Sequence, residues 1–66
     1  MNAYNDLMAE ANGRALTAFL RAMGGQAVLH AKDFGMSQGE CSKALHRLMS
    51  AGLVERTGEC EWRLTA

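Results

Sequence analysis

The stretch from Ser37 to Gly52, SQGECSKALHRLMSAG, constrains the fold more than any other part of the chain. It opens with a capping box, in which the Ser37 side chain can accept from the backbone N–H of Glu40 while the Glu40 carboxylate accepts from the N–H of Ser37. It closes at Gly52, a residue that readily adopts the left-handed conformation found where helices end. We therefore expect an α-helix whose two ends are both defined by local sequence.

The expected helix has two chemically different sides. At about 100° per residue, one side gathers the apolar side chains of Cys41, Ala44, Leu45, Leu48 and Met49. The opposite side is short, polar and basic, and it consists of Gly39, Lys43, His46 and Ser50, flanked by Ser42 and Arg47. Such a helix can pack its apolar side on a core and offer its polar side to a DNA groove.

Residues 2–23 predict an earlier helix, with Asn2 or Asn5 as its cap. Its apolar side chains cover roughly 220° of the helix circumference, whereas a surface helix needs a stripe of only about 100°. Two interpretations remain open. Either the helix is central to the fold, or its spare apolar surface forms a dimer contact, for which the candidates are Leu7, Leu16 and Leu20.

Gly24 and Gly25 should end this first helix. Residues 26–34 then predict a short second helix, which a brief strand at 26–28 could precede. Gly35 and Met36 form the turn before Ser37, so residues 26–51 have the order that a helix-turn-helix requires.

Beyond Gly52 the apolar period falls from 3.6 to 2, which indicates strands. We expect strands at 53–56 and 60–65, joined by a turn at 57–59. Cys60, Trp62 and Leu64 share the face of this hairpin that should lie against the helices, with Trp62 as the main contact.

The run FGMSQGECSKALHRLMSAGLVERTGECEWRL, from Phe34 to Leu64, resembles the winged helix-turn-helix domain of MarR-like bacterial regulators. The fold class expected from this resemblance is mainly α with a small β-hairpin: a three-helix winged helix-turn-helix occupying residues 1–66 as one domain. In that family the third helix reads the major groove, and the hairpin, called the wing, touches flanking DNA. The DNA-binding residues implied here are Gln38, Gly39, Ser42, Lys43, His46 and Arg47 on the helix, with Arg56 and Arg63 on the wing.

The charge balance leaves two functions open. The 66 residues carry seven basic and seven acidic side chains, so the net charge is zero, whereas a nucleic-acid domain usually has a basic excess. The wing also carries Glu55, Glu59 and Glu61. The main hypothesis is a sequence-specific regulator that binds double-stranded DNA as a homodimer. The alternative is a winged-helix protein-interaction module, an accessory or inhibitory factor of a size that fits a phage- or plasmid-encoded product.

Other function classes find little support in the sequence. No serine has histidine and aspartate partners at an elbow, and no glycine-rich phosphate loop is present, so we expect no enzyme activity. Cys41, Cys60, His30 and His46 lack the close ligand pairs of a zinc site, and we expect no metal and no cofactor. Both cysteines should point inward, and whether they have a redox role stays open. Without a signal peptide or a membrane span, the expected location is the cytoplasm.

Overall fold

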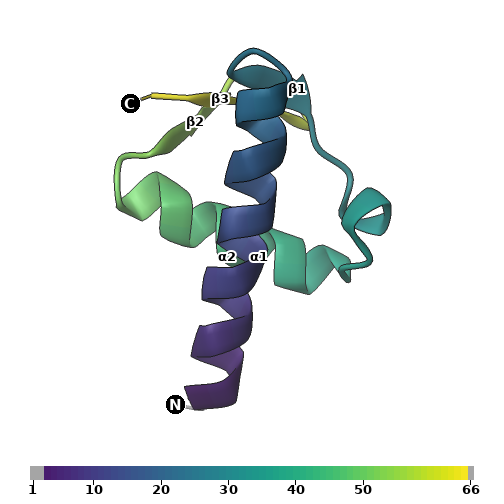
Figure 1. Cartoon of the computed structure of the whole chain (residues 1–66), viewed down its shortest axis with the longest axis vertical. Helices are drawn as coiled ribbons and strands as arrows, with labels where there is room; N and C mark the ends of the chain where they lie inside the picture. Colours follow the sequence, from purple (N-terminus) through teal and green to yellow (C-terminus); the bar gives the residue numbers. More distant parts are fainter. Residues whose placement is uncertain (1–2, 66) are drawn as a thin grey trace.

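The chain places two crossing helices against a small sheet (Figure 1). The computed structural model describes residues 3–65, which contain α1 (Ala3–Ala22), β1 (Gln26–Val28), a short 3₁₀ helix η1 (Ala31–Phe34), α2 (Gln38–Ser50), β2 (Val54–Arg56) and β3 (Glu61–Leu64). The sheet lies near the C-terminal end of α1, while the N-terminal half of α1 extends past α2 (Figure 1). The protein is thus mainly helical, with a three-stranded antiparallel sheet.

The central strand of the sheet is β3, which pairs with β1 on one side and β2 on the other. Trp62 lies opposite Ala27 in one pairing and opposite Arg56 in the other. Its side chain is buried in the core. The hairpin predicted from the period-2 pattern is therefore confirmed, with Trp62 on its inner face and with a third strand added.

The predicted helix at 26–34 is wrong, so the described residues contain two α-helices instead of three. Gly24 and Gly25 adopt φ values of 84° and 96°, and they turn the chain back along β3. The Leu64 N–H donates to the Gly25 carbonyl at 2.7 Å, and Gln26 to Val28 continue the pairing. These bonds join residues far apart in sequence, and they outweigh the local helical pattern. Only 31–34 remains helical, as one 3₁₀ turn.

Both predicted ends of α2 are confirmed. The Glu40 N–H donates to Ser37 Oγ at 3.1 Å, and the Ser37 N–H donates to Glu40 Oε1 at 2.8 Å. Gly52 adopts a φ of 74° just beyond the end. On the inner side Cys41 is buried, as expected, together with Ala44 and Leu45, whereas Met49 is exposed.

The core of the domain lies where α1 crosses α2 and the sheet. Its buried members are Leu16, Leu20, Leu29, Cys41, Ala44, Leu45, Val54 and Trp62. Phe19 and Phe34 add an edge-to-face ring contact at 5.2 Å between centroids, which ties η1 to α1.

Two of the three predicted dimer residues belong to this core. Leu16 and Leu20 are 0% exposed in a single chain, so they offer no surface to a second copy, and their prediction as dimer contacts is wrong. Leu7 is 66% exposed. Of the predicted caps, Asn5 lies inside α1 and Asn2 lies outside the described residues. Neither helix within residues 3–65 combines the length and hydropathy needed to cross a membrane.

Candidate nucleic-acid interface

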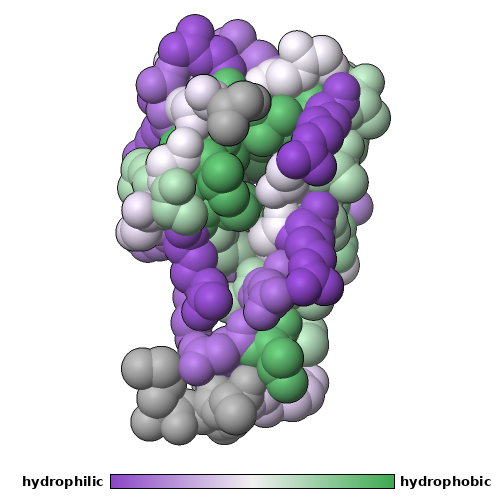
Figure 2. Space-filling model, turned by 60° about the vertical axis from the view of Figure 1, so that its left-hand side comes forward, coloured by the Kyte–Doolittle hydropathy of each residue, from purple (hydrophilic) through white to green (hydrophobic). Residues whose placement is uncertain are grey.

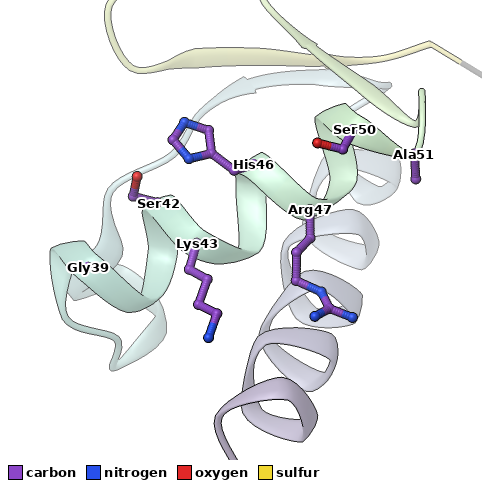
Figure 3. A pocket seen from close by; sticks show the side chains of 7 residues that line it. All are labelled: Gly39, Ser42, Lys43, His46, Arg47, Ser50 and Ala51. Atoms are coloured by element: carbon purple, nitrogen blue, oxygen red, sulfur yellow. The ribbon is translucent and has the colours of Figure 1, made fainter. Parts of the chain in front are cut away.

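The exposed side of α2 forms a shallow hollow of about 700 Å³ (Figure 3). It is lined by Gly39, Ser42, Lys43, His46, Arg47, Ser50 and Ala51, all of which are exposed. Five of the residues predicted to bind DNA therefore share one continuous surface. We call this surface the α2 face.

The side chains of the α2 face form two rows, and neighbouring residues within a row are about one helical turn apart. Lys43 and Arg47 extend along one edge of α2, in the direction of α1 (Figure 3). Ser42, His46 and Ser50 lie along the opposite edge (Figure 3). A row of cations thus runs beside a row of small polar groups and an imidazole, which is the mixture that phosphate and base-edge contacts require.

Gly39 stands at the N-terminal end of the row of cations. A Cβ at this position would meet only Ser37 Oγ, at 3.9 Å. Neither packing within the chain nor a left-handed backbone therefore requires glycine here. Because Gly39 has no side chain, another molecule can approach the exposed backbone of the first turn of α2 closely.

The cations of the α2 face are available to a ligand. Within the described part of the chain, Lys43 and His46 make no side-chain hydrogen bond or ion pair. Arg47 Nη1 lies 3.7 Å from Asp6 Oδ1, and both side chains are partly exposed. An exposed ion pair of this length contributes little free energy, so Arg47 can exchange it for another anion at low cost.

The two arginines of the hairpin differ, because both have partners inside the protein. Arg56 donates from Nε to the Gly58 carbonyl at 3.0 Å and from Nη2 to the Glu59 carbonyl at 2.7 Å. Arg63 pairs with Glu55, its neighbour across β2 and β3. The structure thus uses both guanidinium groups to hold the turn and the strands of the hairpin, and their predicted contact with DNA stays a prediction.

Gln38 and Arg56 line a second hollow of about 380 Å³ on the other side of Ser42 and His46. Cys41 and Cys60 lie on the same lining. Cys41 is buried, and burial raises the pKa of its thiol, with a smaller contribution from Cys60. Cys60 is exposed, so its predicted inward position is wrong. No group of three or more metal-ligating side chains among residues 3–65 is placed to hold an ion.

The structure adds residues that the sequence analysis did not assign to a site. Ser50 and Ala51 extend the α2 face. The helical period had placed Ser50 on this polar side, although neither residue was among the predicted DNA contacts. Arg14 and Arg21 line a separate groove beside α2, together with Arg47. Their spacing of two turns placed them on one side of α1, but nothing in the sequence indicated that this side lies next to α2. Arg63 lines neither of the two hollows.

Comparison of the chain with protein-family models, with curated proteins and with solved structures found no match.

Proposed function

We propose that this protein is a sequence-specific binder of double-stranded DNA, a small cytoplasmic transcriptional regulator of the winged helix-turn-helix kind. One observation carries the proposal: the α2 face gathers Lys43 and Arg47 with Ser42 and His46 on an exposed helix, and Lys43 has no partner within the described chain. The zero net charge of the chain does not oppose this, because Lys43 has no carboxylate partner among the described residues and the ion pair of Arg47 with Asp6 is long and exposed.

In this proposal α2 enters the major groove with its N-terminal end nearest the bases, as recognition helices commonly do. Gln38, the first residue of α2, can bond adenine bidentately, and Arg47 can do the same to guanine. Lys43 and Ser42 fit phosphate contacts. The open backbone at Gly39 allows the first turn to approach the DNA closely.

A homodimer completes the proposal. The N-terminal half of α1 projects beyond the rest of the fold (Figure 1), and Leu7 is exposed there beside the exposed Ala11. An isologous contact through this segment would bury Leu7 of both copies. The two α2 helices would then bind half-sites about 34–36 Å apart, one turn of DNA.

The test is selection of bound sequences from random duplex DNA at 50 and 200 mM salt, with the wild-type chain and a Lys43→Ala, Arg47→Ala double variant run in parallel. The proposal requires the wild type to enrich a palindromic motif and the double variant to lose it. If no motif is enriched, sequence-specific binding is wrong. If a motif without internal symmetry is enriched, the homodimer is wrong, but sequence-specific DNA binding by α2 is supported.

A second candidate function is a protein-interaction module on the same scaffold. The observation that favours it is the hairpin, whose Glu55, Glu59 and Glu61 would repel a DNA backbone, and whose arginines are engaged internally. An empty result in the DNA selection would make this the leading hypothesis.

A further inference from the structure

A groove of about 360 Å³ lies beside the α2 face, between α1 and the C-terminal half of α2. Its lining is contributed by Ala9, Glu10, Gly13, Arg14, Thr17, Arg21, Ala44, Arg47, Leu48 and Leu53. Figure 2 looks on to this side of the molecule, and an apolar strip is visible there between hydrophilic margins. The size is within the range of ligand-binding clefts. We call it the α1–α2 groove.

The floor of the groove is apolar because the two helices approach closely. Gly13 is buried where α1 crosses α2, and a Cβ there would lie 3.5 Å from Leu48 Cδ2. Leu48 is half-buried, and Leu53 at the end of the floor is 41% exposed. The Thr17 hydroxyl donates to the Gly13 carbonyl at 2.7 Å, so its hydrogen-bond donor is already used within α1.

The margins of the groove are cationic. Arg14 and Arg21 stand on α1 two turns apart, about 10.5 Å along the axis, and Arg47 faces them from α2. Glu10 is the single carboxylate of the lining, and it pairs with Arg14. Arg21 makes no hydrogen bond or ion pair of its side chain within the described residues. The lining therefore has an excess of positive charge in a chain whose net charge is zero.

We propose that the α1–α2 groove binds an acidic amphipathic helix of a partner protein. An apolar floor with arginines at its margin is the usual anatomy of a protein-binding site, and helix-in-groove recognition places apolar anchors on such a floor. Carboxylates two turns apart on the bound helix match the spacing of Arg14 and Arg21. Arg21 has no partner among the described residues, and Arg14 would exchange its exposed pair with Glu10. A DNA backbone would match the cations as well, but it has no apolar group that would cover Leu48 and Leu53.

The groove adjoins the α2 face at Arg47, which lines both. A carboxylate of the bound helix at Arg47 would withdraw that guanidinium from DNA. Occupancy of the groove and binding of DNA should therefore oppose each other, although the groove itself does not depend on DNA binding.

The experiment is selection from a displayed library of helical peptides, with the wild-type chain immobilised, followed by affinity measurement on the enriched peptides. We expect enriched peptides with one or two large apolar residues between acidic residues about two turns apart. Arg21→Glu should weaken their binding by at least about tenfold, the effect of replacing one good charged contact with a repulsive one. Lys32→Glu makes the same change of charge at an exposed position of η1, outside the groove. It should leave the affinity for the peptides within about twofold of the wild-type value.

Four outcomes decide the proposal. The proposal is supported if acidic peptides are enriched whose binding is weakened by Arg21→Glu and retained with Lys32→Glu. Leu53→Ser should then also weaken the binding of these peptides. Failure to enrich any peptide, or enrichment of peptides that bind both variants equally, overturns it. Weaker DNA binding by Arg21→Glu with no peptide enriched would assign the groove to phosphates and also overturn it. Because Lys43 does not line the groove, Lys43→Ala tests DNA binding separately, so failure of one proposal is distinguishable from failure of the other.

Discussion

The α2 face and the hairpin each carry two predicted DNA-binding cations, yet the structure treats the two pairs differently. On α2, Lys43 makes no ion pair within the described chain, and Arg47 has only a long exposed one. On the hairpin, Arg56 bonds two carbonyls of its own turn, and Arg63 pairs with Glu55. The cations of α2 therefore have no partner or a weak one among the described residues, whereas the guanidinium groups of the hairpin have close partners within the hairpin.

A count of cations therefore does not locate an interface in a chain of zero net charge. What distinguishes the two regions is the proportion of hydrogen-bonding capacity already used inside the fold. The hairpin also contributes Val54 and Trp62 to the core, whereas no residue of the α2 face is buried. The hairpin therefore contributes to the core, whereas the α2 face remains exposed, which is why we propose it as the DNA-binding surface.

The largest expected effect tests the structural role of the hairpin. Trp62→Ala should cost about 3–5 kcal/mol of unfolding free energy, the usual cost of truncating a buried aromatic residue. A domain of this length has about 3–10 kcal/mol in total, so the variant should be largely unfolded in urea titrations followed by circular dichroism. Trp62→Phe is the control and should remain folded. A Trp62→Ala variant with wild-type stability would show that the hairpin does not hold the fold.

The next effect compares the two pairs of cations directly. Lys43→Ala with Arg47→Ala should weaken DNA binding by roughly 100-fold, since each lost base or phosphate contact costs on the order of 1–3 kcal/mol. It should also reduce the slope of log affinity against log salt by about 1, because Lys43 is the proposed phosphate contact and Arg47 the proposed base contact. Arg56→Ala with Arg63→Ala removes the same charge from the hairpin and should change affinity by less than about threefold. Filter binding at several salt concentrations measures both, and equal losses would contradict the contrast between the regions.

The comparison also explains how far the sequence alone could be interpreted. The ends of α2 were predicted correctly because Ser37, Glu40 and Gly52 act on their own helix, within a few residues. Its inner side followed from the helical period, except that Met49 is exposed. The hairpin was predicted because its period-2 pattern and turn are also local. The residues of the α2 face followed from the helical period, and five of the predicted set share one hollow.

The predictions that failed depended on contacts between distant segments. The helix expected at 26–34 did not form because β3, more than 30 residues later, offers hydrogen bonds to residues 26–28, whereas the brief strand considered at 26–28 is confirmed. Leu7, Leu16 and Leu20 all belonged to one broad apolar arc, and only the crossing with α2 and the sheet decided which part of it was buried. The partners of Arg56 and Arg63 likewise became visible only once the strands were aligned. No pattern within α1 could have indicated that Arg21 lies beside α2.

A smaller effect concerns the cap that positions the first turn of the α2 face. Ser37→Ala should cost about 1 kcal/mol, as loss of a helix N-cap usually does, and it should weaken DNA binding through Gln38 and Gly39. Hydrogen bonds from the backbone and then the side chain of Ser37 lower the pKa of Glu40. A lowered pKa adds stability at pH values above the ordinary range of a glutamate and loses it as the pH falls through the lowered value. Chemical denaturation between pH 6 and pH 3 should therefore show a larger loss of stability in the wild type than in Glu40→Gln, in which only the other carboxylates titrate. Parallel curves would contradict the contribution of the cap.

The smallest change within a single chain is expected for Leu7→Glu, because its side chain is 66% exposed and such substitutions usually alter stability by less than about 0.5 kcal/mol. Its effect should fall on assembly. If α2 supplies nearly all the DNA contacts and the hairpin supplies few, one copy holds too few cations to bind tightly, and a second copy is required.

Light scattering should give a dimer mass for the wild type and a monomer mass for Leu7→Glu, with circular dichroism unchanged. Leu20→Glu would not make this test, because Leu20 is buried in the core and its substitution would unfold the chain. A wild-type chain that is monomeric both free and on a palindromic duplex would contradict the homodimer. One α2 face would then bind DNA alone, and it would have to supply an even larger share of the affinity, relative to the hairpin, than we propose.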